Sequence, residues 1–167
     1  NAPQLETADA VRVVPAVTNP VGVNTFLEQE VDVDLRRRTV AMISDAGIGW
    51  MRQQFPWDTI EPVRKGTFID RVVGVDTWQK YDNIVTLSEE YGPRLIVLLD
   101  TTPPWARPGN EWPATPPANL EDYGDFVEMV ARRYRGRVQH YQIWNEPNLN
   151  YEWGNLDRKS TRLNSSH

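Results

Sequence analysis

The chain has 167 residues, 40% of them hydrophobic, and seven tryptophans, which is enough for one globular domain with a buried core. It has no cysteine and only two histidines, which excludes disulfides and thiolate sites and argues against a histidine-rich metal site. The formal net charge of −5 argues against a nucleic-acid partner, and no apolar run approaches the ~20 residues of a membrane span.

The first twenty residues differ from the rest of the chain. Three prolines interrupt them and apolar periodicity is weak, so we expect residues 1–20 to form a leader or linker, with a short edge strand at residues 11–14. The chain begins with Asn1 rather than Met, so we expect its natural start to lie upstream. A missing start would also remove a signal peptide, so the sequence leaves the localisation open, and a secreted or extracytoplasmic protein is compatible with it.

The last eleven residues, 157–167, do not have the pattern of a folded segment. They contain a single apolar residue, Leu163, and they match, codon by codon, the translation of a common sequencing-library adapter. A natural basic tail is the alternative. We interpret residues 157–167 as a translated artefact and expect the natural sequence to stop at about Leu156.

The first predicted unit is a strand over residues 21–26 followed by a helix over residues 35–46. Asp34 is the expected N-cap, because its carboxylate can accept hydrogen bonds from the first free amides of the helix. Gly47 stands where a left-handed residue commonly ends a helix. The face expected to be buried consists of Leu35, Met42, Ile43 and Ala46.

The second unit starts with a strand over residues 50–55, which a long loop over residues 56–74 follows. Asp76, with Gln79 three positions later, resembles a capping box at the start of the next helix. Gly92 is expected to end this helix, since Pro93 cannot continue it. The predicted apolar stripe of the helix is Trp78, Tyr81, Ile84, Val85 and Tyr91.

The third strand, residues 94–99, is an almost continuous apolar run, which is typical of a strand buried on both faces of a parallel sheet. Asp100 ends it, and residues 101–118 form a proline-rich loop. Asn119 is expected to cap a third helix that closes at Gly136. Its apolar positions at helical spacing are Leu120, Tyr123, Phe126, Val127, Val130 and Tyr134. A fourth strand is predicted over residues 137–144.

Strands and helices therefore alternate, which predicts an α/β fold with parallel strands and right-handed crossovers. A doubly wound sheet and a (β/α)₈ barrel both fit this order. No Gly-x-Gly-x-x-Gly or Walker-type loop follows a strand, which argues against the nucleotide-binding versions. A barrel typically needs about 250 residues, so four strands predict roughly half of one.

The fourth predicted strand ends in Trp144-Asn145-Glu146-Pro147-Asn148. A carboxylate and a carboxamide at a strand end can be held rigidly and still face a cleft, where α/β enzymes place their chemistry. The stretch resembles the fourth-strand motif of clan A glycoside hydrolases, which are retaining enzymes on a TIM (β/α)₈ barrel. Asn and Pro are also ordinary turn residues, so a plain strand-to-loop turn is the alternative.

Other stretches resemble the same clan, and family thirty-nine and cellulase-like enzymes most of all. The resemblance implies that residues 21–156 are the N-terminal half of a glycosidase-like barrel, its first four β/α units, truncated after strand four. Outside the fourth strand it depends on Trp50-Met51-Arg52, Trp57, Glu61-Pro62 and Pro103-Pro104-Trp105.

The resemblance also implies roles for single residues. Glu146 matches the general acid/base of the clan, and Asn145 matches the amide that contacts the 2-hydroxyl of the sugar. Arg52, at the predicted end of strand two, matches an arginine that orients the nucleophile; a structural ion pair is the alternative. The nucleophile itself would be a Glu on strand seven, outside this chain, and Glu152 is expected to be a solvated loop acid.

Several further residues are weaker candidates. Trp105 could stack on a sugar face, although aromatic rings also fill cores, and Asp100 could bind a hydroxyl or cap a loop. His140 is expected to pack inside the barrel rather than to act in catalysis. Trp57 and Trp112 are less favoured than Trp105 as residues that stack on a sugar, and Glu28 and Glu61 are expected to face the cleft side.

The sequence thus predicts a retaining glycoside hydrolase that acts on O-glycosidic bonds of an oligo- or polysaccharide, without a cofactor or metal. It does not indicate an oligomeric state. Two other classes of protein fit the pattern: a non-catalytic carbohydrate-binding barrel and a small doubly wound α/β binding domain.

Overall fold

The computed structural model describes residues 19–156, and its centre is a sheet of four parallel strands in the order β1-β2-β3-β4. Sequential order with right-handed crossovers places every connecting helix on the same face of the sheet. A doubly wound sheet instead reverses its strand order at a switch point. The architecture is therefore that of consecutive β/α units of a barrel, as predicted. The strands are β1 (Gly22–Thr25), β2 (Trp50–Pro56), β3 (Arg94–Asp100) and β4 (His140–Ile143).

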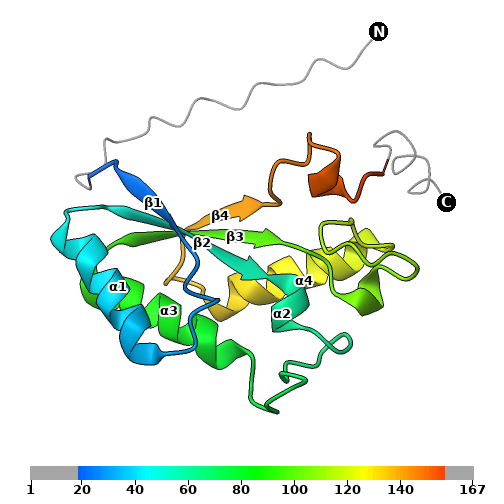
Figure 1. Cartoon of the computed structure of the whole chain (residues 1–167), viewed down its shortest axis with the longest axis horizontal. Helices are drawn as coiled ribbons and strands as arrows, with labels where there is room; N and C mark the ends of the chain where they lie inside the picture. Colours follow the sequence, from blue (N-terminus) through cyan, green and yellow to red (C-terminus); the bar gives the residue numbers. More distant parts are fainter. Residues whose placement is uncertain (1–18, 157–167) are drawn as a thin grey trace, which may run out of the picture.

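The helices cover one face of this sheet (Figure 1). Each long helix connects two neighbouring strands, and α2 is a single turn directly after β2. The α-helices are α1 (Val33–Asp45), α2 (Trp57–Ile60), α3 (Trp78–Tyr91) and α4 (Leu120–Arg133). Two 3₁₀ turns, η1 (Pro104–Ala106) and η2 (Tyr151–Trp153), follow β3 and β4. No helix within residues 19–156 is long and apolar enough to cross a membrane.

The core lies between the helices and the sheet, because alternate strand residues point to opposite faces. Met51 and Phe55 of β2, with Val97 and Leu99 of β3, are fully buried on the helix side. The helices contribute Val40, Ile84, Phe126 and Val130. The opposite face is largely polar, and it carries Asn24, Arg52, Gln54 and Gln142. This polar face is the one on which the candidate site is built.

Helix α1 differs from its prediction. It begins at Val33, and its cap is Asp32 rather than Asp34: the Asp32 Oδ1 accepts hydrogen bonds from the amides of Asp34 (2.8 Å) and Leu35 (3.3 Å). Its buried residues are Arg36, Val40 and Ile43, whereas Leu35 and Met42 are 41% and 63% exposed. The prediction of an inward Leu35 and Met42 was wrong because the stripe includes an arginine. The Arg36 guanidinium reaches the Lys80 carbonyl at 3.3 Å while its stem is buried.

Helices α3 and α4 agree with their predictions more closely. Trp78, Tyr81, Ile84 and Val85 are buried, and Gly92 takes the left-handed conformation with φ 96°. The N-cap position of α3 is Thr77, but the carboxylate of Asp76 still accepts the Trp78 amide at 2.9 Å. The Asn119 Oδ1 caps α4 by accepting the Glu121 amide at 3.0 Å. Leu120, however, is 53% exposed and not part of the core.

Strand boundaries shift at the ends of β2 and β4. Strand β2 continues to Pro56, so Arg52 lies inside the strand rather than at its end. Strand β4 begins at His140 instead of 137, because the backbone before it still forms the closing turns of α4, with the Val138 amide bonded to the Tyr134 carbonyl at 3.0 Å. It stops at Ile143, since Trp144 takes a positive φ of 61°.

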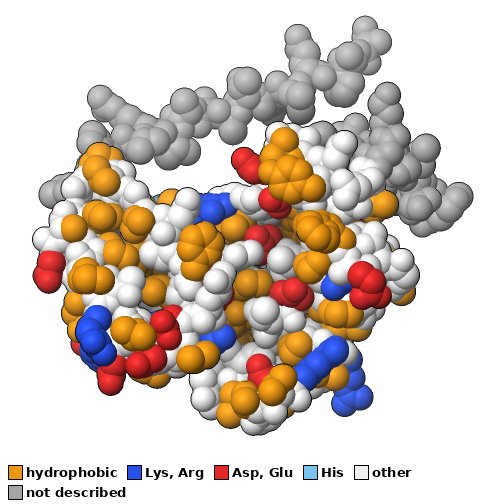
Figure 2. Space-filling model, in the orientation of Figure 1, with side chains coloured by type: hydrophobic (Ala, Val, Ile, Leu, Met, Phe, Trp, Pro, Cys, Tyr) orange, Lys and Arg blue, Asp and Glu red, His pale blue; other side chains and the backbone are white. Residues whose placement is uncertain are grey.

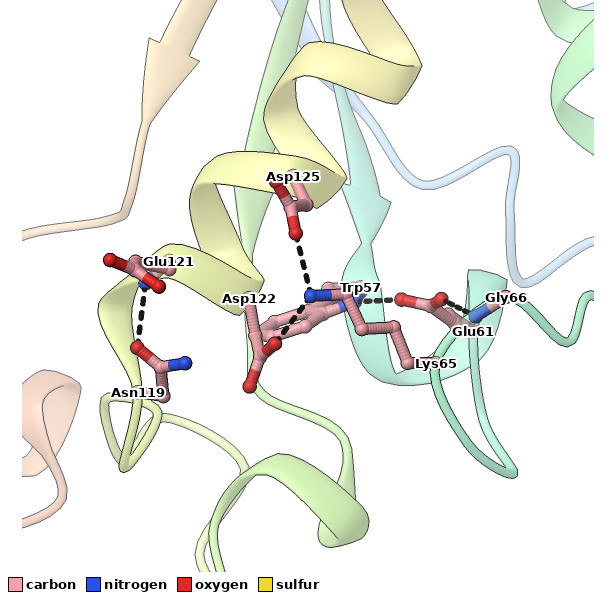
Figure 3. A network of polar contacts seen from close by, with 8 residues as sticks. All are labelled: Trp57, Glu61, Lys65, Gly66, Asn119, Glu121, Asp122 and Asp125. Atoms are coloured by element: carbon pink, nitrogen blue, oxygen red, sulfur yellow. Dashed lines mark hydrogen bonds and ion pairs between the residues drawn. The ribbon is translucent and has the colours of Figure 1, made fainter.

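Ion pairs join the segment that follows α2 to α4 (Figure 3). Lys65 Nζ lies 2.6 Å from carboxylate oxygens of both Asp122 and Asp125. Within the same segment, the Glu61 carboxylate accepts hydrogen bonds from Trp57 Nε1 at 2.7 Å and from the Gly66 amide. The predicted loop 56–74 is therefore an ordered element that contains α2.

Hydrophobic side chains also reach the surface. Figure 2 shows them scattered over one side of the molecule among acidic and basic side chains. Val72 is 91% exposed and Val31 84% exposed, and Ile143 of the edge strand β4 is 54% exposed. The expected leader, its edge strand at 11–14 and the expected artefact at 157–167 lie outside the described residues.

Candidate functional site

The end of β4 turns sharply to present the predicted motif. Trp144 and Glu146 both have left-handed backbones, with φ of 61° and 39°, which non-glycine residues rarely adopt outside functional sites and tight turns. The Trp144 amide still bonds the Leu99 carbonyl at 2.8 Å, so the turn remains attached to β3. The Trp144 side chain is buried, and its Nε1 donates to the Glu152 carbonyl at 2.7 Å. Glu146 itself is exposed, at the rim of the sheet.

Arg52 connects strand β2 to this turn across the polar face of the sheet. Its Nε donates to Gln142 Oε1 and its Nη2 to Asn145 Oδ1, both at 2.8 Å. A longer contact of 3.4 Å joins Nη1 to Asn24 Oδ1. The planar guanidinium can satisfy several acceptors in fixed directions. Arg52 thereby holds the amide of Asn145 directly beside Glu146.

Asp100 lies on the same face, at the end of β3. Asp100 as a residue is 6% exposed, and Gln54 Nε2 lies 2.9 and 2.8 Å from its two carboxyl oxygens. Burial raises the pKa of Asp100 to about 7, against the hydrogen bond from Gln54, and the Asp58 and Glu152 carboxylates raise it further. An acid that is partly protonated near neutrality can either donate or accept a hydrogen bond.

Asp58 and Thr101 form a second polar contact next to Asp100. The Thr101 hydroxyl lies 2.9 Å from Asp58 Oδ1, and Thr101 has a positive φ of 59°. Burial also raises the pKa of Asp58, opposed by the Thr101 hydrogen bond. Two acids with raised pKa values at one sheet edge are typical of a functional site, although structural networks can produce the same effect.

The aromatic candidates occupy different places. Trp57 is fully buried, with its ring stacked on Phe126 at 5.5 Å, so it is a core residue and not a residue of the cleft. Trp105 is half-buried; its ring meets Trp57 edge-on at 5.4 Å and its Nε1 donates to the Glu61 carbonyl. Trp112 is 51% exposed and bonds the Tyr151 carbonyl.

Two of the three additional acids are buried in the core. Glu61 is 3% exposed, within the contacts shown in Figure 3. Glu28 is 7% exposed and accepts from Gln53 Nε2 on the helix side of the sheet. The expectation that Glu28 and Glu61 face the cleft was therefore wrong. Glu152 is half-buried in η2, and its charge raises the pKa of Asp100. It therefore lies near the site and is not the fully solvated loop acid that was expected.

The structure thus brings Arg52, Asn145 and Asp100 together with the turn that bears Glu146, and it adds residues that sequence reasoning missed. Gln54 and Gln142 hold Asp100 and Arg52. The sequence contains a signal for Gln54, because Arg52 and Gln54 are two positions apart on one strand and so share a face. Within residues 19–156, no group of three or more Asp, Glu or His side chains could hold a metal ion.

A separate hollow of about 230 Å³ lies at the amino ends of β3 and β4, away from Glu146. Its lining includes Arg94, Arg137 and His140. His140 is exposed at the start of β4 and meets the Trp50 ring edge-on at 4.9 Å, rather than being packed inside a closed barrel as predicted. Because the carboxyl ends of parallel strands carry the chemistry in this architecture, we assign the candidate site to the end with Glu146.

Comparison with known proteins finds similar solved structures and one curated relative, whereas no protein-family model matches the chain. The GH39 enzyme from Xanthomonas axonopodis pv. citri matches 84% of this chain and 29% of its own, with a TM-score of 0.56 and 22% identity. A family 39 glycoside hydrolase from Bacteroides cellulosilyticus WH2 matches 77% of this chain and 24% of its own, with a TM-score of 0.55 and 21% identity.

Among curated proteins, the chloroplastic β-glucosidase-like SFR2 of Oryza sativa subsp. japonica is 24% identical over 110 residues, which is 65% of this chain and 17% of that protein. The chain therefore spans about a quarter of the length of these two solved enzymes and less of the curated relative. At these identities the likeness shows the fold. Residues 19–156 form a four-stranded parallel β/α sheet that resembles the N-terminal part of glycoside hydrolase TIM barrels.

Proposed function

We propose that the chain carries the acid/base half of a retaining glycoside hydrolase that acts on O-glycosidic bonds of oligo- or polysaccharides. Glu146 is the general acid/base, Asn145 binds the 2-hydroxyl of the sugar, and Arg52 orients both the Asn145 amide and the nucleophile. The observation that carries the proposal is the pair of 2.8 Å hydrogen bonds from Arg52 to Gln142 and Asn145. They hold Asn145, the residue before Glu146, just beyond the carboxyl end of β4.

The chemistry follows from these positions. Glycoside hydrolysis with retention needs an acid on the leaving oxygen and a second carboxylate about 5–5.5 Å away on the other side of the sugar. Glu146, exposed at the rim, is accessible to a leaving group. The nucleophile is expected on strand seven, beyond this chain. Two acids within the chain, Glu28 and Glu61, are buried in the core and cannot take that role.

The test is the Glu146→Gln variant in a complete protein that contains this chain. Without its acid, turnover of alkyl glycosides with poor leaving groups should fall by about 10²–10⁴-fold. Aryl glycosides with activated leaving groups, which need little protonation, should lose much less in the glycosylation step. Equal and slight losses for both substrate classes would remove Glu146 from the role.

Two controls accompany this test. Glu121→Gln changes an exposed acid at the start of α4 and should leave both activities unchanged. The 167-residue chain by itself should not hydrolyse aryl glycosides above background, because it lacks the strand-seven carboxylate. Turnover by this chain that disappears in Glu146→Ala would contradict that expectation and would point to a second carboxylate within it, with Glu152 the first candidate.

A second candidate is a non-catalytic carbohydrate-binding barrel, because Arg52, Asn145 and Asp100 offer polar groups to a sugar whether or not a nucleophile is present. The two functions differ in one residue, because only the enzyme requires a Glu at the end of strand seven. A complete protein that binds oligosaccharides but has another residue there would be the binding protein.

A further inference from the structure

Asp100 occupies a defined place in the candidate site. It is the last residue of β3 and pairs in register with Pro56 at the end of β2. Its contact with Gln54, which shares a face of β2 with Arg52, places the carboxyl group on the polar face of the sheet. Although that face is the open one, Asp100 is only 6% exposed.

The hydrogen bonding around Asp100 suits a neutral acid better than a carboxylate. Gln54 Nε2 is the side-chain donor that contacts its oxygens, and no Lys or Arg within residues 19–156 forms an ion pair with it. When a carboxylate is buried beside one neutral donor, most of its desolvation penalty is not compensated. The protonated form is neutral and has no such penalty to offset. A protonated carboxyl group also has an O–H that needs an acceptor.

Most of the charged groups that face Asp100 also disfavour its ionised form. Asp58 of α2 and Glu152 of η2 disfavour its ionisation, and Arg52 of β2 opposes them as the weakest of the named influences. On the helix side, burial raises the pKa of Tyr81 and Tyr123, and the charge of Asp100 raises both values further. Among these influences in the described part of the chain, Arg52 is the only positive charge, and it is too weak to offset the burial of a carboxylate.

We propose that Asp100 binds the saccharide as a neutral carboxylic acid, donating its proton in a hydrogen bond to a sugar hydroxyl oxygen. This inference rests on the proposed function of the site and names the chemical form in which one residue recognises the ligand. A neutral acid can donate to and accept from hydroxyl groups, whereas an ionised one can only accept. Loss of the proton therefore weakens binding.

The experiment measures the affinity for xylotriose and cellotriose in the complete protein with Glu146→Gln, so that binding is not obscured by turnover. Because only the protonated form binds well, the affinity should be about tenfold weaker at pH 8 than at pH 6. Adding Asp100→Asn, which keeps a donor at all pH values, should preserve the affinity at pH 6 and abolish this difference. Asp45→Asn, at the exposed end of α1, should leave the pH profile unchanged.

A second measurement does not depend on the folding of a variant. The ¹³C resonance of the Asp100 carboxyl group reports its titration, and by linkage a ligand that prefers the protonated form must raise the midpoint. A lowered midpoint, or a pH difference that persists in Asp100→Asn, would overturn the role of Asp100 while leaving the binding site in place. Absence of binding of both trisaccharides at every pH would instead overturn the proposed function, and this inference with it.

Discussion

The polar side chains of this site are held in place by hydrogen bonds to one another. Arg52 reaches Gln142, Asn145 and Asn24 from the middle of β2, while Gln54 reaches Asp100 from the next residue on the same face. Both are long side chains on a central strand, whose backbone is paired on each side. Preorganisation of this kind is what a ligand-binding constellation needs, because groups that are already ordered lose little entropy on binding.

The buried acid predicts a pH dependence of stability. The pKa of Asp100, raised by burial to about 7, lies above the value of about 4 expected in the unfolded chain. Between these two values the unfolded state releases the proton while the folded state keeps it, so stability falls as pH rises through this window. The contribution of Asp100 to the free energy of unfolding should decrease by about 4 kcal/mol from about pH 4 to pH 7 and stay level above it.

Urea unfolding of the complete protein that contains this chain, with and without Asp100→Asn, measures this contribution as the difference between the two pH profiles. The difference is needed because other acids titrate too. Asp58, whose pKa burial also raises, contributes with the same sign. Glu89, whose pKa the hydrogen bond from Arg137 lowers, contributes with the opposite sign and loses stability as pH falls. Parallel profiles for the two proteins would show that Asp100 is ionised when folded.

At the scale of the element, each helix follows its caps and its buried stripe. Helix α4 has Asn119 at its N-cap, acids in its first turn and two arginines in its last, all of which complement the helix dipole. Helix α1 has its cap at Asp32 and contains a buried arginine. The helices fix the position of the strands and hence of the residues at the strand ends.

The cap of α1 can be tested by a matched pair of substitutions. Asp32→Ala should lower the free energy of unfolding by about 1 kcal/mol, since the amides of Asp34 and Leu35 lose their acceptor. Asp34→Ala removes an acid from the first turn but no cap, so a loss of only a few tenths of a kcal/mol is expected. Chemical denaturation of the complete protein that contains this chain compares the two variants. A larger loss for Asp34→Ala would restore Asp34 as the cap.

At the scale of the whole molecule, the sheet is covered on one face and open on the other. Strands β1 and β4 each pair on one side only among the described residues. A barrel has no such edges, because it closes on itself. Unpaired edges are templates for association with another chain, and exposed apolar residues such as Ile143 add to that tendency.

The 167-residue chain should therefore self-associate, with a concentration-dependent sedimentation coefficient. Its stability is expected to be low, because a domain holds only about 5–15 kcal/mol and each unburied aliphatic side chain forfeits about 1.5–3 kcal/mol. Ile143→Lys places a charge on the edge strand β4 and should reduce association. Val72→Lys, at the 91% exposed residue in the segment between α2 and α3, is the control and should not. A monomer with one cooperative unfolding transition would contradict the prediction.

Local sequence determined the order of the elements and most of their ends. The runs at 50–55 and 94–99, the left-handed Gly92 and the cap at Asn119 were predictable because strand alternation, helical periodicity and caps depend on residues a few positions apart. The fourth strand was likewise predicted to end at Trp144, and the structure ends it at Ile143, followed by left-handed Trp144 and Glu146.

Tertiary structure alone decided which polar residues meet. Glu61 and Asp100 both lie near the carboxyl end of a strand in the sequence, yet Glu61 bonds Trp57 in the core while Asp100 lies on the polar face. Arg36 is buried where a stripe of apolar residues was expected, and Arg52 reaches Asn145, 93 positions away. Such contacts depend on the register between strands and on the rotation of each helix against the sheet. Both are set by the packing of the whole core, so no local pattern contains them.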